Sequence, residues 1–401
     1  MSSQLKLVAA ATGGNPGAQL VLAERLAHEG EGEAAIVWLA RAAGTGHAES
    51  FALFGVWQLL GYNIERNVDE GLERLAIAAR SGEDRAAAFL ANAHASGLAG
   101  ATDWTRALDW LVEAARMGNA RALVQVALLQ SAGTAHPHRA ALLHAAFHAG
   151  FDAASTMAAA SPAPSHPIAP AALPWPELRA GIDISSLLAS APAAEIHFES
   201  PWIATRRAAV SEDICRYLIA IAAPRLEPAM VNVPGQGQGA HQMRSNSFMT
   251  IGPAYGDLLI QVLNARLACM TSTPVECQED SNVLRYLSGE SYDDHYDFFD
   301  PAAPDFRDEI ARNGQRVATA LVYLNSGYEG GATEFPNLGW QFRGNRGDVI
   351  AWRNVKPDGS PDPRTLHAGR PPLSGEKWIL SKWIRSRTRA APIIAAIPRT
   401  R

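Results

Sequence analysis

The chain has few cysteines, and their number and spacing exclude two classes of protein. Three occur among 401 residues, Cys215, Cys269 and Cys277, and no two of them form a CxxC pair. An odd and widely spaced set does not provide the disulfide framework of a small secreted domain, and it does not suggest a zinc module. We therefore expect reduced thiols in a cytoplasmic protein.

Long apolar runs and blocks of positive charge are missing as well. No stretch of about 18 apolar residues runs without polar interruption, so we expect no membrane span. The opening residues lack the charged start, apolar core and cleavage site of a secretory signal. The formal net charge is -5 and no long basic block is present, so nucleic acid is not an expected partner.

The first part of the chain is rich in alanine, which recurs with a regular period. Alanine pairs followed by a glycine close successive amphipathic runs, and the closing residues are Gly46, Gly82, Gly118 and Gly150. A glycine just past a helix end suits a left-handed C-cap, and a period in the mid-thirties indicates paired helices stacked as a solenoid. We expect about four such repeats in a helical domain over residues 1–160, with an irregular bundle as the alternative.

A proline-rich stretch ends the helical pattern. Residues 161–170 read SPAPSHPIAP, which cannot continue a helix, and we expect a semi-rigid linker over 161–180. Beyond it, in residues 181–401, alanine becomes less frequent and strand-like segments alternate with Gly and Asn turns. Two helices are expected there as well, one starting after Ser211 and one over residues 255–268.

The most informative pattern in the second half is His295-Tyr296-Asp297. On a strand, residues two apart point to the same face, and His367 from another strand would complete a set of two histidines and one carboxylate. That set holds a divalent metal with adjacent positions open, as in non-haem Fe(II) oxygenases. An HxD triplet alone is weak, because a chain with 12 histidines should contain roughly one by chance.

Strand-like segments surround this triplet and give it a structural setting. They lie at 282–287, 316–325, 347–352 and 375–384. Short strands at this spacing predict a double-stranded β-helix, or jelly roll, which binds a ligand between its facing sheets. The expected fold is therefore multidomain, with an N-terminal α-helical repeat solenoid followed by a C-terminal jelly roll with supporting helices.

The combined motifs resemble the prolyl 4-hydroxylase group of Fe(II)- and 2-oxoglutarate-dependent dioxygenases. They are RYxxGxxYxxHxD at 285–297, RxATxLxYLN at 316–325, GGxTxFP at 330–336, HAG at 367–369 and GEKW at 375–378, with Arg244-Ser245-Asn246-Ser247 approximating the family's RTS segment. The likeness covers residues 205–386. The helical half resembles the Sel-like branch of the tetratricopeptide family through its AAxxG closures.

The resemblance implies roles for individual residues. His295, Asp297 and His367 would bind the metal, and Lys377 would pair with the distal carboxylate of 2-oxoglutarate, unless it is a surface lysine. The remaining expected contacts are hydroxyls from Tyr286 and Thr319 to that same carboxylate, and Tyr292 and Trp383 near the substrate cleft. Ordinary core or strand positions are the alternative for Tyr286, Thr319 and Trp383. Arg370 stands where family members often have cysteine, with little expected consequence.

The resemblance also implies the activity. Fe(II), 2-oxoglutarate and dioxygen would be used to hydroxylate an aliphatic carbon, giving succinate and carbon dioxide, with ascorbate as reductant. The retained carboxylate Asp297 favours hydroxylation over halogenation. We expect prolyl 4-hydroxylation of a peptide or protein that docks in part on the repeats. The alternatives are a free amino-acid or small-molecule hydroxylase whose repeats serve dimerisation, and a repeat scaffold whose second half senses iron, oxygen or 2-oxoglutarate.

The sequence does not decide between two structures for one segment. Residues 235–241 are glycine-rich and are either a mobile lid over the cleft or a hairpin tip. They lack the Lys-Ser/Thr ending of a phosphate-binding loop.

Overall fold

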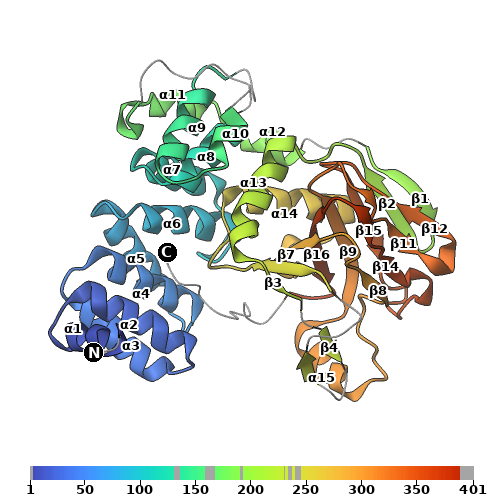
Figure 1. Cartoon of the computed structure of the whole chain (residues 1–401), viewed down its shortest axis with the longest axis horizontal. Helices are drawn as coiled ribbons and strands as arrows, with labels where there is room; N and C mark the ends of the chain where they lie inside the picture. Colours follow the sequence, from blue (N-terminus) through green and yellow to red (C-terminus); the bar gives the residue numbers. More distant parts are fainter. Residues whose placement is uncertain are drawn as a thin grey trace. The chain divides into compact units, whose positions relative to one another are not determined.

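The computed structural model of the chain is shown in Figure 1, and it divides into two compact units. The described residues are 3–130, 136–158, 168–189, 193–229 and 245–388, with the backbone alone at 231–233 and 237–239. Unit 1 contains Met1–Leu187 and Pro253–Gln261, and unit 2 contains Leu188–Gly252 and Val262–Ala391. Among the described residues, no helix combines the length and apolarity that a membrane span needs.

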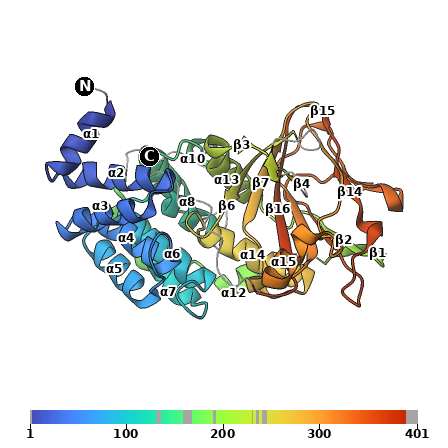
Figure 2. The ribbon, with the colours of Figure 1, turned by 90° about the horizontal axis from the view of Figure 1, so that it is seen from below.

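Unit 1 consists of antiparallel helix pairs that follow the period of the sequence (Figures 1 and 2). The pairs are α2 (Pro16–His28) with α3 (Gly32–Gly44), α4 (Ala48–Leu60) with α5 (Val68–Arg80), α6 (Asp84–Ser96) with α7 (Trp104–Arg116), and α8 (Ala120–Leu129) with α9 (Arg139–His148). The helix α1 (Ser3–Thr12) precedes them. The four closing glycines have φ between 82° and 99°, as a left-handed cap requires.

Small residues let the paired helices approach closely. A Cβ atom at Gly71 of α5 would lie 2.8 Å from the Gly55 carbonyl oxygen of α4, so neither position can carry a side chain without displacing the other helix. The helix starts are fixed by polar caps, as where Asn67 and Asp103 accept hydrogen bonds from Glu70 N and Arg106 N. The repeat pattern of alanine and glycine thus sets the spacing of the stack.

Part of the segment expected to be a linker is helical. Residues 159–167, most of the proline-rich stretch, lie outside the described residues. After them, α11 (Trp175–Ala180) belongs to unit 1, buries Trp175 and places Arg179 Nε 2.8 Å from Asp109 Oδ1 of α7. The expected spacer over 161–180 therefore includes a helix that packs on the repeats.

Unit 1 also contains residues 253–261, which are distant from the repeats in sequence. Asn92 Nδ2 of α6 donates to Pro253 O at 2.9 Å, and Leu258 N donates to Gln125 Oε1 of α8 at 3.0 Å. Asp257 pairs with Arg121 and caps α14 (Leu258–Thr271). Because of this cap, the helix expected over 255–268 begins later than its sequence suggested.

The two larger sheets of unit 2 are antiparallel (Figures 1 and 2). The large sheet has the order β1 (Glu195–Glu199), β2 (Trp202–Arg206), β13 (Val349–Arg353), β9 (Arg316–Tyr323), β16 (Lys377–Arg385), β7 (Ser281–Tyr286), β6 (Ser247–Ile251) and β3 (Glu227–Pro228). The small sheet has the order β12 (Trp340–Phe342), β11 (Thr333–Phe335), β14 (His367–Gly369) and β8 (Tyr292–His295). This is the arrangement that the strand pattern predicted.

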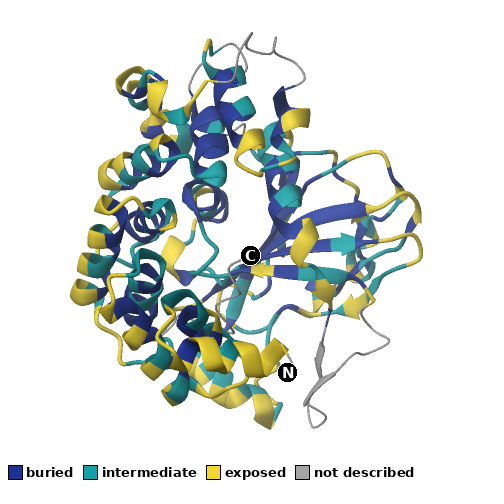
Figure 3. Cartoon of the chain, turned by 60° about the vertical axis from the view of Figure 1, so that its left-hand side comes forward, coloured by how far each residue is buried: buried dark blue, intermediate teal, exposed yellow. Residues whose placement is uncertain are grey.

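The core of unit 2 lies between the two sheets. Leu321, Trp352 and Ile379 from the large sheet pack with Phe335 and Phe342 from the small sheet in one buried cluster. Figure 3 shows the buried positions concentrated along these strands and along the facing sides of the paired helices of unit 1. The expected helix α13 (Glu212–Ala222) is present and is capped by Ser211.

The glycine-rich segment forms a hairpin where its backbone is described. The strand β4 (Val231–Val233) pairs with β5 (Gly237–Gly239) in antiparallel register. Residues 234–236 and 240–244, which include Arg244 of the expected RTS segment, lie outside the described residues.

Candidate active site

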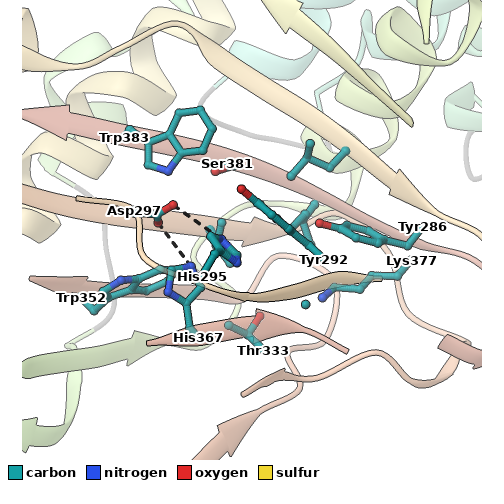
Figure 4. A pocket seen from close by; sticks show the side chains of 14 residues that line it. Tyr286, Tyr292, His295, Asp297, Thr333, Trp352, His367, Lys377, Ser381 and Trp383 are labelled. Atoms are coloured by element: carbon teal, nitrogen blue, oxygen red, sulfur yellow. Dashed lines mark ion pairs between the residues drawn. The ribbon is translucent and has the colours of Figure 1, made fainter. Parts of the chain in front are cut away.

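Strand pairing in the small sheet brings the two histidines together. His295 ends β8, His367 begins β14, and the two are partners in the antiparallel register. Asp297 follows directly, with Oδ2 3.4 Å from His367 Nε2 and Oδ1 3.8 Å from His295 Nε2 (Figure 4). Ligand atoms from all three lie within 4.8 Å of one another, as one metal ion requires.

Backbone carbonyls orient both imidazoles. His295 Nδ1 lies 2.7 Å from Asp293 O, and His367 Nδ1 lies 2.9 Å from Thr365 O. A carbonyl oxygen only accepts, so each Nδ1 carries a proton, and each Nε2 has a lone pair for a metal once it is deprotonated. The three side chains therefore present two neutral nitrogens and a carboxylate to one point, a donor set that fits Fe(II).

Asp297 is buried and keeps its charge. Burial alone would raise the pKa of its carboxyl, but the imidazoles of His367 and His295, when they are protonated, and a hydrogen bond from Thr319 hold that pKa below its usual range. Thr319 Oγ1 donates to Asp297 Oδ2 at 2.6 Å. The single hydroxyl proton of Thr319 is therefore used in its hydrogen bond to Asp297. Among the described residues, Thr319 does not line the cavity beside the three ligands. This differs from the contact to 2-oxoglutarate that we expected.

The cavity extends from the three ligands to Lys377, which lies at its other end (Figure 4). Seven of the eight residues singled out from the sequence line it, namely Tyr286, Tyr292, His295, Asp297, His367, Lys377 and Trp383. Its walls are otherwise mostly apolar, and the side chains that complete them are Leu284, Leu321, Thr333, Trp352, Ile379 and Ser381, next to Gly369. A mostly apolar cavity with a few convergent polar groups is typical of a small-molecule site.

Lys377 carries a buried and unsatisfied ammonium group. It is 0% exposed, and its Nζ has no hydrogen-bond partner within the described parts of the chain. The Nζ atom lies 5.3 Å from the ring centroids of both Tyr286 and Tyr323. Burial lowers the pKa of Lys377 to about 7. A carboxylate of a bound ligand would restore its charge and its hydrogen bonds.

Thr333, which was not among the residues expected at the site, lines the cavity near Lys377 in Figure 4. Its Oγ1 lies 2.8 Å from the hydroxyl of Tyr323, and because Tyr323 gives its one proton to Phe342 O at 3.0 Å, Thr333 is the donor of this bond. The signal was present in the GGxTxFP motif, where this threonine is the conspicuous polar residue. Gly331 of the same motif has φ of +67°, and a Cβ there would lie 3.3 Å from Lys377 Cδ.

Two aromatic rings border the ligand end of the cavity. Tyr292 stacks on His295, with ring centroids 3.5 Å apart and planes inclined by 14°. Trp383 lines the cavity, and the guanidinium of Arg316 lies 3.8 Å from its ring centroid. Both rings are therefore held in place, Tyr292 by the imidazole and Trp383 by a cation on its face.

A buried ion cluster supports Trp383. Glu279 accepts hydrogen bonds from Arg316 at 2.7 and 2.9 Å and also pairs with Arg385, while its backbone N–H donates to Trp383 O at 2.8 Å. Burial would raise the pKa of Glu279, but Arg316 and Arg385 lower it to about 2. Glu279 thus holds the guanidinium of Arg316, which lies against Trp383 in the wall of the cavity.

The sequence of the second half matches known oxygenases. Residues 281–385 match the 2OG-Fe(II) oxygenase superfamily. The chain is 35% identical over 205 residues to Prolyl 4-hydroxylase 1 of Arabidopsis thaliana, which covers 47% of this chain and 70% of that protein. It is 32% identical over 195 residues to prolyl 4-hydroxylase subunit alpha-1 of Gallus gallus, which covers 48% of this chain and 37% of that protein.

Solved structures give more distant likenesses. The viral collagen prolyl hydroxylase of Paramecium Bursaria Chlorella virus-1 is 28% identical, with a TM-score of 0.36, and covers 46% of this chain and 96% of that one. A Sel1 repeat protein from Oxalobacter formigenes is 26% identical, with a TM-score of 0.32, and covers 38% of this chain and 46% of that one. Because both TM-scores are low, the sequence relationship carries the comparison.

The depressed pKa of Glu279 predicts acid-sensitive stability. Ionised Glu279 should stabilise the fold above its model-compound pKa of 4.5, and this contribution should be lost as the pH falls toward about 2. The difference between these pKa values corresponds to about 3 kcal/mol. In urea unfolding at pH 7, Glu279→Gln should lower the free energy of unfolding by roughly that amount, and the loss should shrink at pH 3.

The matched control is Glu309→Gln, which removes a more exposed partner of the same Arg385. It should cost no more than about 1 kcal/mol. Equal stability of Glu279→Gln and the wild type at pH 7 would contradict the role assigned to this carboxylate.

Proposed function

This chain belongs to the prolyl 4-hydroxylase family of 2-oxoglutarate- and Fe(II)-dependent oxygenases, and we propose that it hydroxylates proline in a peptide or protein. The observation that carries the proposal is the pairing, in one cavity, of a His-Asp-His cluster with a buried lysine that lacks a partner within the described residues. The first can hold a metal and the second can hold the far end of a dicarboxylate.

His295, Asp297 and His367 are the proposed Fe(II) ligands. The donor set suits a divalent metal because each imidazole can offer a deprotonated Nε2 while its Nδ1–H bonds a carbonyl, and because the carboxylate is ionised. Bound Fe(II) would supply the oxidation of 2-oxoglutarate by dioxygen that places a hydroxyl group on an aliphatic carbon. Ascorbate is the proposed reductant, and a cytoplasmic setting is proposed on the free state of the cysteines.

Lys377 is proposed to bind the distal carboxylate of 2-oxoglutarate. Thr333 lines the cavity beside it but donates to Tyr323, and Thr319 donates to Asp297, so each threonine already uses its proton within the protein. Tyr286 lines the same end of the cavity and is the proposed hydroxyl contact. The surrounding Leu and Ile side chains keep water away from this charge pair, which strengthens it.

The acceptor is proposed to be a proline-containing peptide or protein. Tyr292 and Trp383 offer flat, fixed rings beside the metal ligands, which suits a five-membered aliphatic ring. The matching relatives are named prolyl 4-hydroxylases. The repeats are proposed to bind other parts of the acceptor, on surfaces other than Asn92, Arg121 and Gln125, which contact residues 253–258 of this chain.

Removal of a metal ligand tests the site. His295→Ala and Asp297→Ala should each abolish succinate release from 2-oxoglutarate and the thermal stabilisation produced by added metal. For the wild type, metal at a hundredfold excess over its dissociation constant should stabilise by about 2.7 kcal/mol. The control is His197→Gln, a unit 2 histidine that contacts Thr205 and should keep both properties. Turnover that survives in both alanine variants would refute the assignment.

The pKa of Lys377 predicts proton uptake on cosubstrate binding. At pH 8 the amine is mostly neutral in the free protein because its pKa is about 7, and a bound carboxylate should recharge it. Calorimetry of 2-oxoglutarate binding to Mn(II)-loaded protein, in buffers of different ionisation enthalpy, should give uptake of about one proton at pH 8 and much less at pH 6.

Lys377→Arg provides the control for this measurement. An arginine stays protonated at pH 8, so any binding that remains should take up no proton at this site. Equal uptake by the wild type at the two pH values would show that Lys377 is not the group that changes.

An acceptor assay tests the proposed substrate class. Proline-containing peptides should stimulate succinate release and gain a hydroxyl group detectable by mass spectrometry, and the same peptides with alanine in place of proline should do neither. Stimulation by free amino acids alone would refute a peptide acceptor and support the small-molecule alternative.

A further inference from the structure

The loop that leads into His367 contains a buried carboxylate outside the cavity. This loop, residues 354–366, connects β13 to β14. Asp362 is 1% exposed and caps the short turn η6 (Pro363–Thr365), where its Oδ1 accepts from Arg364 N at 3.1 Å. The Arg364 side chain folds back on the same carboxylate, with contacts of 2.9 and 2.7 Å.

The capped turn aims the carbonyl that orients His367. Thr365 is fully buried and donates twice to Asp362 O, from its backbone N at 3.0 Å and from its Oγ1 at 2.7 Å. Its own carbonyl oxygen accepts from His367 Nδ1–H at 2.9 Å. The direction of the His367 Nε2 lone pair therefore depends on a turn that Asp362 holds at both its side chain and its backbone.

The same loop also reaches Asp297. Asp362 N donates to Asn354 O at 3.1 Å, and Asn354 Nδ2 donates to Thr319 Oγ1 at 2.9 Å. Thr319 in turn donates to Asp297 Oδ2. Two of the three proposed ligands are thus oriented from this loop, whereas His295 is oriented by Asp293 O, a carbonyl of its own strand.

We propose that Asp362 is a positioning residue for the metal, which sets metal affinity through the Pro363–Thr365 turn without touching metal, cosubstrate or acceptor. The proposal rests on the proposed function, because it assumes that His367 binds Fe(II). Within the described residues, neither Asp362 nor Asn354 lines the cavity. Groups behind metal ligands commonly change metal affinity by about 10- to 100-fold when they are removed.

Titration with Co(II), followed by its visible absorption, tests the proposal. Asp362→Ala should bind Co(II) about 10- to 100-fold more weakly than the wild type. Asp362→Ser should stay close to wild type, because serine caps a turn about as well as aspartate. With Co(II) saturating, the affinity for 2-oxoglutarate should be the same in all three proteins, which a general loss of structure would not produce.

Asp358→Ala is the matched control. Asp358 lies in the same loop and its Oδ1 accepts from Ser360 N at 2.9 Å and Ser360 Oγ at 2.6 Å, but these bonds do not lead to His367. It should leave Co(II) affinity unchanged. Wild-type Co(II) affinity in Asp362→Ala, or an equal loss in Asp358→Ala, would overturn the proposal.

A second variant covers the case in which Asp362→Ala does not fold. Thr365→Val keeps the cap and removes only the hydrogen bond from Thr365 Oγ1 to Asp362 O, so it should weaken Co(II) binding severalfold, and unchanged binding would overturn the proposal. Failure of the proposed function gives a different result, because a wild-type protein that binds no Co(II) would refute the metal site itself.

Discussion

The candidate active site depends on the register between β8 and β14. His295 and His367 are 72 residues apart in the chain, and they meet because they are cross-strand partners at the ends of two short strands. In antiparallel pairing, a shift of one residue would turn one imidazole to the opposite face of the sheet. The cluster of His295, Asp297 and His367 requires this one register.

The charged side chains around the cavity differ in which groups offset the free-energy cost of burying their charge. Asp297 is compensated within the protein by a hydroxyl and, when they are protonated, by two imidazoles, and Glu279 is compensated by two arginines. Lys377 is fully buried, yet its ammonium group lacks a hydrogen-bond partner among the described residues. A buried amine without a counter-ion destabilises a fold, so its retention is best explained by a negatively charged ligand. The cavity is therefore organised for an anion at one end and for a cation at the other.

Much of this arrangement could be predicted from the sequence because its signals are local or periodic. The closing glycines gave the helix pairs, the HxD triplet with a distant histidine gave the cluster, and GEKW pointed to Lys377. The role of Thr319 could not be predicted, because its partner is chosen by the packing of β9 against the residues after β8. Thr333 and Asp362 are small polar residues whose importance comes only from the neighbours that the fold provides. The contact of α11 with α7 joins residues 70 positions apart, which no local pattern reveals.

The assignment of residues 253–261 to unit 1 has a consequence for the modularity of the chain. The sequence leaves unit 1 after Leu187, returns to it at Pro253 and leaves it again after Gln261. The second half of the chain therefore cannot be separated from unit 1 by cutting the chain at a single position. A fragment starting at residue 188 would carry Leu258, Leu259 and Ile260 without the helices of unit 1. The repeats, if prepared alone, would in turn lose the hydrogen bonds that Asn92 and Gln125 make with this segment.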